Sequence, residues 1–267
     1  MAGTHAPAPV DAVELKAKVK AMYRAVAEDP GGRYHFELGR ALAERLGYPA
    51  EMLDRIPAAA VESFAGVGYF FDLAGLREGE AVLDLGSGSG MDVFFAAGQV
   101  GPGGRVVGVD MTPEQLAKAE RLRTEGEFDH VTFTEGHIED LAFPDASFDV
   151  VISNGVINLS VDKSRVFAQA ARVLRPGGRL AIADIIAETE LSAQTVANTD
   201  LWASCIGGAS QQEVYQDAIR AAGLRLEVMK RNSYHFLSPQ ARNASEQYGV
   251  KSVSALASKN EGRRAWT

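Results

Sequence analysis

Cysteine is almost absent from this sequence: Cys205 is the one thiol in 267 residues. A single thiol cannot form an internal disulfide or a zinc site built from several thiolates, so we predict no metal site. A protein of this kind is expected in the reducing cytoplasm. The sequence also lacks a run of about 18 apolar residues and a basic, then apolar, N-terminal segment. We therefore expect neither a membrane span nor a secretory signal.

Positive charge is also in short supply. The chain has 27 Lys and Arg against 35 Asp and Glu, which gives a formal net charge of −8. An acidic surface repels phosphate backbones and anionic lipids, and no local cluster of basic residues offsets that repulsion. The expected partner is a small-molecule substrate, with no nucleic acid and no membrane, and the expected assembly is a monomer or a homodimer. The remaining composition, 46% hydrophobic and 23% charged, is that of an ordinary globular protein.

The first part of the chain is predicted to be helical. Between residues 13 and 27 the apolar side chains recur mainly every three or four positions, which is typical of one face of an amphipathic helix. Two more helices are expected at residues 36–46 and 51–64, the second of them broken by Pro57. These segments predict an all-helical lead-in.

The pattern changes at Gly79, after which short apolar runs alternate with helix-like segments. Strands are expected at residues 81–86, 105–110, 131–136, 148–154 and 179–185, and helices at 113–124 and 162–174. This alternation is typical of a parallel sheet whose strands are joined by crossover helices and buried on both faces. The predicted fold class is therefore α/β, with a doubly wound sheet.

The rest of the chain is expected to extend the same sheet. Helices are predicted at residues 190–206 and 211–222, and strands at 224–230 and 250–258. Because no full-length crossover helix is expected between these two strands, we expect an antiparallel pair at the sheet edge. The predicted organisation is a disordered tail (1–10), a helical cap (11–75), the α/β domain (76–259), of which residues 187–247 partly cover the substrate, and a second tail (260–267).

The strongest motif, DLGSGSG, runs from Asp84 to Gly90, where the first expected strand gives way to a helix. Glycines at alternate positions let the backbone turn tightly and approach a ligand closely. A dinucleotide-binding loop would need glycine at position 91, which is Met91, so a pyrophosphate ligand is not predicted. The carboxylate of Asp84 would also repel a pyrophosphate, whereas it suits a ligand with an ammonium group. A plain turn is the alternative for any one of these glycines.

A second acid, Asp110, ends the next expected strand, 20 residues after Gly90. A carboxylate at this place can accept hydrogen bonds from both hydroxyls of a ribose. The glycine-rich loop, the acid beside it and Asp110 together indicate a nucleoside that bears an amino acid. S-adenosylmethionine is the common ligand of that kind.

Residues 79–186 resemble a class I S-adenosylmethionine-dependent methyltransferase. The resemblance rests on VLDLGSGSG (82–90), GVD (108–110), the segment 136–154 and LRPGGRL (174–180). It implies a seven-stranded Rossmann-like sheet of order 3-2-1-4-5-7-6 with an antiparallel strand seven, and S-adenosylmethionine as the cofactor. It also implies cofactor contacts at Asp84, Gly86, Ser87, Gly88, Gly90, Asp110, Met111, His137, Ile138, Glu139 and Asn154, with residues 137–139 beside the adenine.

Further motifs resemble the arsenite methyltransferase branch, namely SNGVINL (153–159), LWASCIGGA (201–209) and YGVKSVS (248–254). That branch binds trivalent arsenic through several cysteines. The matching positions here hold Val67, Gly155 and Cys205, and neither Val nor Gly can donate an electron pair to a metalloid. The resemblance therefore carries over the fold and the cofactor but not the substrate. We predict methyl transfer to a small organic acceptor.

The acceptor end of the site is less well defined by the sequence. The predicted substrate contacts are Tyr69, Gly155, Asn158, Asp184 and Trp202, and the candidate catalytic residues are His35, His235 and Cys205. An imidazole can accept a proton near neutral pH, although methyl transfer does not require a dedicated base. Surface histidines and a buried apolar cysteine are the alternatives for the catalytic candidates. The alternative functions are a thiol, selenol or metalloid methyltransferase that uses Cys205, and a non-catalytic regulatory protein that binds S-adenosylmethionine.

Overall fold

A seven-stranded sheet forms the centre of the computed structural model, which describes residues 10–203 and 205–261. Its strands are β1 (Ala81–Leu85), β2 (Arg105–Asp110), β3 (Val131–Glu135), β4 (Phe148–Asn154), β5 (Leu174–Ile186), β6 (Leu224–Arg231) and β7 (Lys251–Lys259). The order is β3-β2-β1-β4-β5-β7-β6. β7 runs antiparallel to both of its neighbours, whereas the other pairs are parallel. The predicted fold class, strand order and antiparallel edge pair are confirmed.

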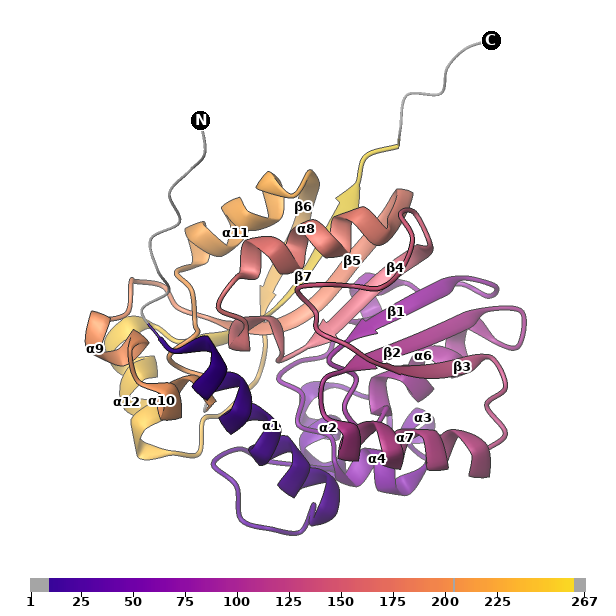
Figure 1. Cartoon of the computed structure of the whole chain (residues 1–267), viewed down its shortest axis with the longest axis horizontal. Helices are drawn as coiled ribbons and strands as arrows, with labels where there is room; N and C mark the ends of the chain where they lie inside the picture. Colours follow the sequence, from indigo (N-terminus) through magenta and orange to yellow (C-terminus); the bar gives the residue numbers. More distant parts are fainter. Residues whose placement is uncertain (1–9, 204, 262–267) are drawn as a thin grey trace.

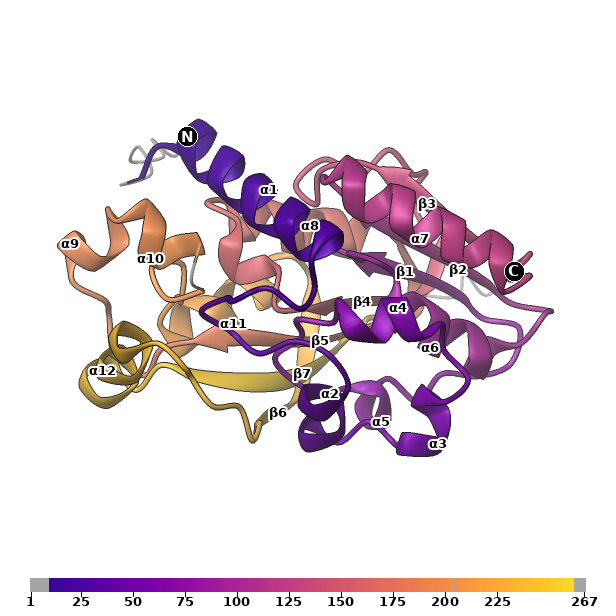
Figure 2. The same cartoon turned by 90° about the horizontal axis from the view of Figure 1, so that it is seen from below.

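Helices cover both faces of the sheet, as Figures 1 and 2 show. Val82 of β1 packs in one apolar cluster with α6 (Met91–Val100), and the next residue, Leu83, packs in another with α8 (Lys163–Val173) and α11 (Gln212–Ala221). Successive side chains of a strand point to opposite faces, so a strand buried on both faces must be apolar throughout. α7 (Pro113–Glu125) joins β2 to β3. This two-sided burial explains why the central strands are continuous apolar runs.

From residue 10 onward, where the described residues begin, the chain forms five helices before the sheet: α1 (Ala12–Glu28), α2 (Arg40–Leu46), α3 (Ala50–Leu53), α4 (Ala58–Glu62) and α5 (Phe71–Ala74). The helix predicted over residues 13–27 is confirmed, and Asp11 caps it by accepting the amide protons of Val13 and Glu14. The helix predicted over 36–46 is wrong at its start, because Gly39 has a φ of +84° and α2 begins after it. The predicted break at Pro57 is confirmed, since Pro57 separates α3 from α4.

The C-terminal segment differs from the sequence prediction in two places. The single helix predicted over residues 190–206 is instead two short helices, α9 (Ala193–Val196) and α10 (Thr199–Ala203). Between them the Asn198 side chain accepts two backbone amide protons of α10, which starts a new helix there. A further helix, α12 (Pro239–Tyr248), joins β6 to β7 and was not predicted. The Ser238 hydroxyl caps it by accepting the amide proton of Ala241.

α1 lies across the carboxyl-end edge of the sheet (Figure 2). An apolar cluster of Val10, Leu15, Val19, Leu159 and Trp202 joins α1 to α10 and to the loop after β4. Apart from Val10, Asn260 and Glu261, the two predicted tails lie outside the described residues. The division into a cap (11–75) and an α/β domain (76–259) remains a prediction. Within the described residues, no helix has the length and apolar character needed to span a membrane.

Candidate functional site

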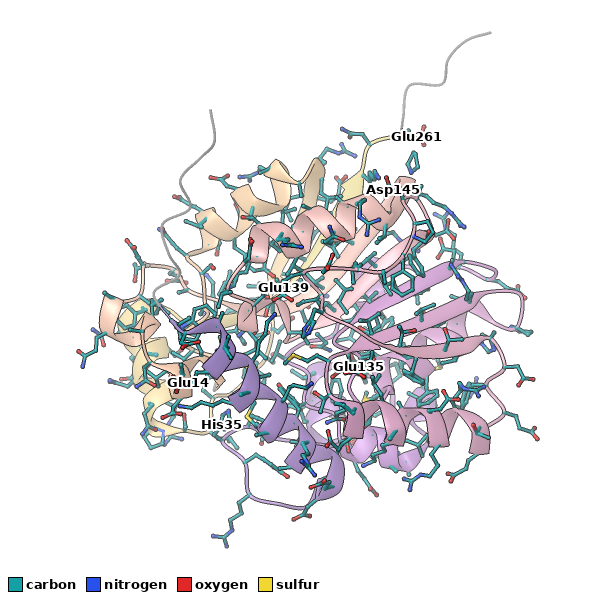
Figure 3. All side chains as sticks on the ribbon, viewed as in Figure 1. Glu14, His35, Glu135, Glu139, Asp145 and Glu261 are labelled. Atoms are coloured by element: carbon teal, nitrogen blue, oxygen red, sulfur yellow. The ribbon has the colours of Figure 1, made fainter. Side chains whose placement is uncertain are left out.

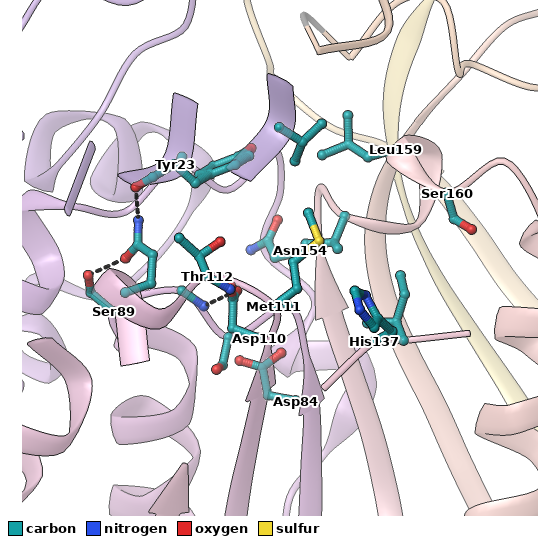
Figure 4. Close-up of a pocket in the computed structure, with 18 of the residues that line it drawn as sticks. Tyr23, Asp84, Ser89, Asp110, Met111, Thr112, His137, Asn154, Leu159 and Ser160 are labelled. Carbon is teal, nitrogen blue, oxygen red and sulfur yellow. Dashed lines mark hydrogen bonds between the residues drawn. The ribbon is translucent and has the colours of Figure 1, made fainter. Parts of the chain in front are cut away.

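A pocket lies between α1 and the carboxyl ends of β1, β2, β3 and β4 (Figure 4). Open α/β sheets bind ligands at this edge, where loops from neighbouring strands meet. Leu15, Lys16, Val19 and Tyr23 of α1 form one wall, and the glycine-rich loop after β1 forms the opposite one. Strand ends and the N-terminal helix therefore enclose one common site.

The glycine-rich loop turns sharply from β1 into α6. Gly86, Gly88 and Gly90 all have positive φ angles, of +76°, +52° and +92°. A Cβ at Gly86 would lie 2.4 Å from Val156 Cγ2, and one at Gly90 would lie 2.7 Å from Phe133 Cζ. Conformation and space therefore both require glycine at these two positions. Gly86 and Gly88 line the pocket, whereas Gly90 precedes the first residue of α6.

Asp110 ties two of the loops together. Its carboxylate accepts the amide protons of Gly88 at 2.9 Å and of Thr112 at 2.8 Å, and both Thr112 and Met111 line the pocket (Figure 4). Burial raises the pKa of Asp110, and these hydrogen bonds oppose the rise because they favour the charged form. Asp110 is therefore fixed at the end of β2 with its carboxylate at the pocket wall, as the ribose prediction requires.

Asp84, at the end of β1, is almost completely buried and also lines the pocket. Burial raises the pKa of its carboxyl well above the ordinary value, and the neighbouring Asp92 and Asp110 raise it further. Lys16 is the one lysine or arginine among the described residues that line this pocket. The interior of the site is therefore acidic, which suits a ligand with positive charge.

A hydrogen-bonded network that the sequence analysis did not identify supports the floor of the pocket. Asp92, in the first turn of α6, accepts the Tyr48 hydroxyl proton at 2.6 Å and an Asn154 Nδ2 proton at 3.0 Å. Asn154 Oδ1 accepts the amide proton of Val67 at 2.8 Å, so Asn154 fastens the 65–69 loop to the end of β4. Burial raises the pKa of Asp92 to about 6, against the opposing effect of its two hydrogen bonds.

The loop after β3 contributes the predicted adenine-side residues. His137, Ile138 and Glu139 all line the pocket, and Glu139 accepts a hydrogen bond from the Ser160 hydroxyl at 2.7 Å. In Figure 3, Glu139 and His35 lie on opposite sides of α1. The role of residues 137–139 as adenine contacts remains a prediction.

Gln115 connects the glycine-rich loop to α1. It accepts a hydrogen bond from the Ser89 hydroxyl, and its Nε2 donates to the Tyr23 carbonyl at 2.8 Å (Figure 4). Gln115 occupies the third position of α7, where a glutamine often caps its own helix. That local alternative concealed its long-range role in the sequence, and Gln115 was not predicted.

The structure places the predicted catalytic histidines outside the pocket. His35 lies in the loop between α1 and α2, with its ring edge-on to Phe36 at 4.6 Å between centroids. His235 is exposed in the segment after β6. Neither is among the residues that line the pocket. The structure therefore does not bring either histidine together with the predicted cofactor contacts.

Two of the predicted substrate contacts take part in the packing of the fold. Tyr69 packs edge-on to Tyr48, with ring centroids 4.9 Å apart. Asp184 accepts the Tyr215 hydroxyl proton at 2.6 Å and the amide proton of Ile185 at 2.9 Å. Burial raises the pKa of Asp184 to about 6, and the Tyr215 hydrogen bond opposes that rise. Neither residue lines the pocket.

Trp202, Asn158 and Cys205 lie close together beside α10. Trp202 Nε1 donates to the Val196 carbonyl at 2.5 Å, and Asn158 Nδ2 donates to the Cys205 carbonyl at 3.1 Å. Burial raises the pKa of the Cys205 thiol to about 12. At neutral pH the thiol therefore keeps its proton, whereas the thiolate is the form that acts as a nucleophile or soft ligand. None of the three lines the pocket.

Val67 and Gly155 lie side by side. Gly155 has a φ of +72°, and a Cβ added to it would lie 3.2 Å from Val67 Cγ1. The two positions that the family resemblance linked to arsenic binding thus adjoin one another in this fold. They present methyl groups and a bare backbone in place of sulfur. Among the described residues, no group of three or more His, Cys, Asp or Glu could hold a metal ion.

The residues of this pocket fit S-adenosylmethionine. The Ser87 hydroxyl is buried with no hydrogen-bond partner among the described residues, so a polar ligand atom would satisfy it. Asp110 offers a carboxylate to ribose hydroxyls, and Asp84 offers one to an ammonium group. At Gly88 an added Cβ would meet only Gln115 Oε1, at 3.7 Å, so the backbone there is open to close approach.

Comparison with known proteins agrees with this fit. A family model described as a methyltransferase domain matches residues 76–223. The arsenite methyltransferase of Halobacterium salinarum is 40% identical over 210 residues, which cover 78% of this chain and 54% of the relative. The human arsenite methyltransferase is 41% identical over 137 residues, which cover 48% of this chain and 36% of the relative. The chain spans about half the length, or less, of the curated relatives that it matches.

Solved structures of methyltransferases are also similar to this chain. An arsenic(III) S-adenosylmethionine methyltransferase from Chlamydomonas reinhardtii is 32% identical, with a TM-score of 0.63 over 85% of this chain and 75% of that chain. A geranyl diphosphate methyltransferase is 19% identical with a TM-score of 0.66, which shows the shared fold alone. The predicted enzyme class and cofactor are confirmed. The chain belongs to the methyltransferase domain family and has the class I S-adenosylmethionine-dependent methyltransferase fold.

Proposed function

We propose that this chain methylates a small, neutral organic acceptor and does not methylate arsenite. The observation that carries the proposal is that Val67 lies directly beside Gly155: a Cβ added to Gly155 would lie 3.2 Å from Val67 Cγ1. Trivalent arsenic needs several soft donors to hold its lone pair in a fixed direction. Of the three positions that match cysteines of the arsenite methyltransferase branch, Val67 and Gly155 have no side-chain donor atom. The thiol of the third, Cys205, is protonated at neutral pH.

The charge and polarity of the pocket favour a neutral acceptor. Charged Asp84 and Asp92 would repel an anionic substrate, and Lys16 is the one lysine or arginine among the described residues of the lining. The side of the pocket toward α1 and the loop after β4 is apolar, with Leu15, Val19 and Leu159. Apolar lining with few polar groups is typical of sites for small organic molecules.

The residues of this chain would act by binding and alignment. The bound cofactor supplies a methyl group already activated by its sulfonium. Asp110 would hold the ribose, Asp84 the amino group and residues 137–139 the adenine, while α1 would exclude water from the reacting atoms. Alignment of two reactants in this way can contribute about 7–11 kcal/mol to the lowering of the barrier. Among the described residues that line the pocket, His137 is the one histidine, and it lies on the predicted adenine side; we therefore assign no dedicated base.

Metalloid methylation is the second candidate, because the curated relatives named above are arsenite methyltransferases. In this chain it would depend on Cys205 as the single protein thiol. Cys205→Ser therefore separates the two candidates: it should leave methylation of an organic acceptor nearly unchanged and should abolish metalloid methylation.

The test is a screen of fractionated metabolite extracts with methyl-labelled S-adenosylmethionine. The proposal expects label in an organic product together with S-adenosylhomocysteine, for both the unmodified chain and Cys205→Ser. Asp110→Ala serves as the control that binds the cofactor poorly. Label that passes only to arsenic species, or the absence of turnover with any fraction despite cofactor binding, would refute the organic-acceptor proposal.

A further inference from the structure

Tyr23 brings a hydroxyl group from α1 to the predicted acceptor end of the pocket, which is lined by Leu15, Val19 and Leu159. In Figure 4 its ring lies on the same side of the pocket as Leu159, and Asp84 lies on the opposite side. The Tyr23 side chain is half-buried. A tyrosine that is packed in this way usually gives its hydroxyl a hydrogen-bond partner. What bonds to this hydroxyl is therefore a guide to what the acceptor end binds.

The Tyr23 hydroxyl has no hydrogen-bond partner in the part of the chain that the structure describes. The hydrogen bond drawn at Tyr23 in Figure 4 ends on its backbone carbonyl instead. The neighbouring polar side chains are already bonded within the protein. Ser63 accepts a hydrogen bond from Lys118 Nζ at 2.7 Å, Ser160 bonds to the loop after β3, and Asn154 uses both polar atoms of its amide. Tyr23 therefore keeps a hydrogen-bonding group for a ligand.

The protein also fixes the position of this hydroxyl. Gln115 Nε2 donates to the Tyr23 carbonyl at 2.8 Å, and Gln115 is 2% exposed and bonded to Ser89. The Tyr23 ring stacks on Phe36, with ring centroids 6.1 Å apart. Burial raises the pKa of Tyr23 well above its ordinary value, so the neutral hydroxyl can both donate and accept a hydrogen bond. A group that is held in place before its ligand arrives loses little freedom on binding.

We propose that Tyr23 binds the methyl acceptor, and that the acceptor is a mainly apolar molecule with one hydroxyl or carbonyl oxygen that bonds to the Tyr23 hydroxyl. This inference rests on the proposed methylation of a neutral organic acceptor. Tyr23 orients the acceptor through that bond and takes no part in making or breaking covalent bonds. The apolar side chains beside it hold the rest of the acceptor.

This arrangement selects against two other classes of molecule. A hydrocarbon without an oxygen atom would leave the Tyr23 hydroxyl unpaired inside the occupied pocket. A molecule with many polar groups would bury them against Leu15, Val19 and Leu159, where they would lose their hydrogen bonds to water. One oxygen on an apolar body is therefore the chemistry that fits this end best.

The test uses phenol and toluene as probes, because they have similar shapes and differ in a single hydroxyl group. Each probe is titrated by NMR into the full chain loaded with S-adenosylhomocysteine, first unmodified and then as Tyr23→Phe. The substitution keeps the ring on Phe36 and removes the hydroxyl. We expect it to weaken phenol binding about threefold to tenfold, the size of one neutral hydrogen bond, and to leave toluene binding unchanged.

Tyr34→Phe is the matched control. Tyr34 stacks on the same Phe36, with centroids 5.7 Å apart, but its hydroxyl donates to the Asp29 carbonyl at 2.7 Å and it does not line the pocket. This variant should bind both probes as the unmodified chain does. Calorimetry should show an unchanged affinity of Tyr23→Phe for S-adenosylmethionine, and thermal unfolding checks that both variants are folded.

An acceptor found in the methylation screen supplies a second readout. For that acceptor, kcat/KM of Tyr23→Phe should fall about tenfold while cofactor affinity stays the same. Failure of the screen to find any acceptor would refute the proposed function. The two probes need no turnover, so they test the Tyr23 site separately.

Four results would overturn the proposal. The unmodified chain could bind neither probe, or Tyr23→Phe could leave phenol binding unchanged or weaken both probes equally. Tyr34→Phe could weaken phenol as much as Tyr23→Phe does, which would assign the effect to the packing of Phe36. A tenfold loss of S-adenosylmethionine affinity in Tyr23→Phe would make Tyr23 a cofactor contact instead.

Discussion

The cofactor end and the acceptor end of this pocket are built in different ways. At the cofactor end, Asp84 and Asp110 lie at the ends of adjacent parallel strands, and the residues that hold Asp110, Gly88 and Thr112, come from the loops that follow these two strands. At the predicted acceptor end, the walls come from α1, the loop that contains Ala65 and Gly66, and the loop after β4. The first end is specified locally, whereas the second depends on contacts between distant segments. A few side chains at the acceptor end can therefore change the substrate while the cofactor end remains intact.

Asp110 and Asp184 show the same contrast at the level of single residues. Both carboxyl groups are buried near the carboxyl end of a strand, β2 for Asp110 and β5 for Asp184. Asp110 lines the cofactor pocket, but Asp184 is occupied by Tyr215, Ile185 and Asn158. Position at a strand end thus does not decide between ligand binding and structural support. What decides it is whether another side chain of the protein already fills the space.

The largest effect is expected from Asp110→Ala. This change removes a charged acceptor for two ribose hydroxyls and also frees the amide groups of Gly88 and Thr112. Hydrogen bonds to charged groups contribute about 1.5–3 kcal/mol each. Affinity for S-adenosylmethionine should fall by at least about tenfold in calorimetry at a temperature where the variant is folded, and the melting temperature should also fall because two amide groups lose their acceptor. Unchanged affinity, or tighter binding of NAD than of S-adenosylmethionine, would refute the cofactor geometry.

Tyr215→Phe is expected to have a smaller effect. It should lower the stability of the fold without changing cofactor binding. The pKa of Asp184 is raised to about 6, so its ionisation lowers the stability of the folded state as pH rises through that value. Tyr215 limits this loss by donating to the charged carboxylate. Without the hydroxyl, the free energy of unfolding should fall by about 1.5–3 kcal/mol at pH 8 and by less at pH 5.

Urea denaturation of the Tyr215→Phe variant at the two pH values measures this difference, and calorimetry should show nearly unchanged cofactor affinity. A loss of stability that is equal at pH 5 and pH 8 would contradict the account of Asp184. A large loss of cofactor affinity would mean that Asp184 belongs to the ligand site after all.

The smallest effect is expected at the acceptor end, from Gly155→Ala. An alanine there would need a left-handed backbone, and its Cβ would approach Val67 Cγ1 to 3.2 Å. We expect a loss of about 1–2 kcal/mol in the free energy of unfolding. Gly223→Ala is the matched control, because Gly223 has a φ of +82° and nothing within 4 Å of an added Cβ. Gly155→Ala should therefore cost more than Gly223→Ala.

A double-mutant cycle with Val67→Ala sharpens this prediction. If the two positions touch, the loss in Val67→Ala/Gly155→Ala should be smaller than the sum of the single losses by about 0.5 kcal/mol or more. Additive losses in urea denaturation would show that Val67 does not fill the space beside Gly155.

Local patterns made the fold and the cofactor end predictable. Continuous apolar runs marked the strands, and DLGSGSG combines strand, turn and helix start in a short stretch. α12 escaped prediction because two alanines, Ala241 and Ala244, are its only buried residues among those described, which leaves no apolar stripe in the sequence. Asp92 escaped because its partners Tyr48 and Asn154 are 44 and 62 residues away.

The acceptor end could not be predicted in the same way. Trp202, Tyr69 and Asp184 have residue types that often contact substrates, but each is satisfied by packing or by a hydrogen bond within the protein. A sequence does not show which buried polar groups find partners in the fold. The family resemblance singled out Val67 and Gly155, and only the structure shows that the two positions are adjacent.

The central claim, an intact cofactor end beside an acceptor end that no longer suits arsenic, is tested most directly with arsenite, glutathione and labelled S-adenosylmethionine. The unmodified chain should form methylated arsenic at least about a hundredfold more slowly than Val67→Cys/Gly155→Cys, because loss of a third of the alignment energy has that effect. The paired change also removes a Val67 methyl group near the new side chain. Rapid arsenite methylation by the unmodified chain, abolished by Cys205→Ser, would contradict the account.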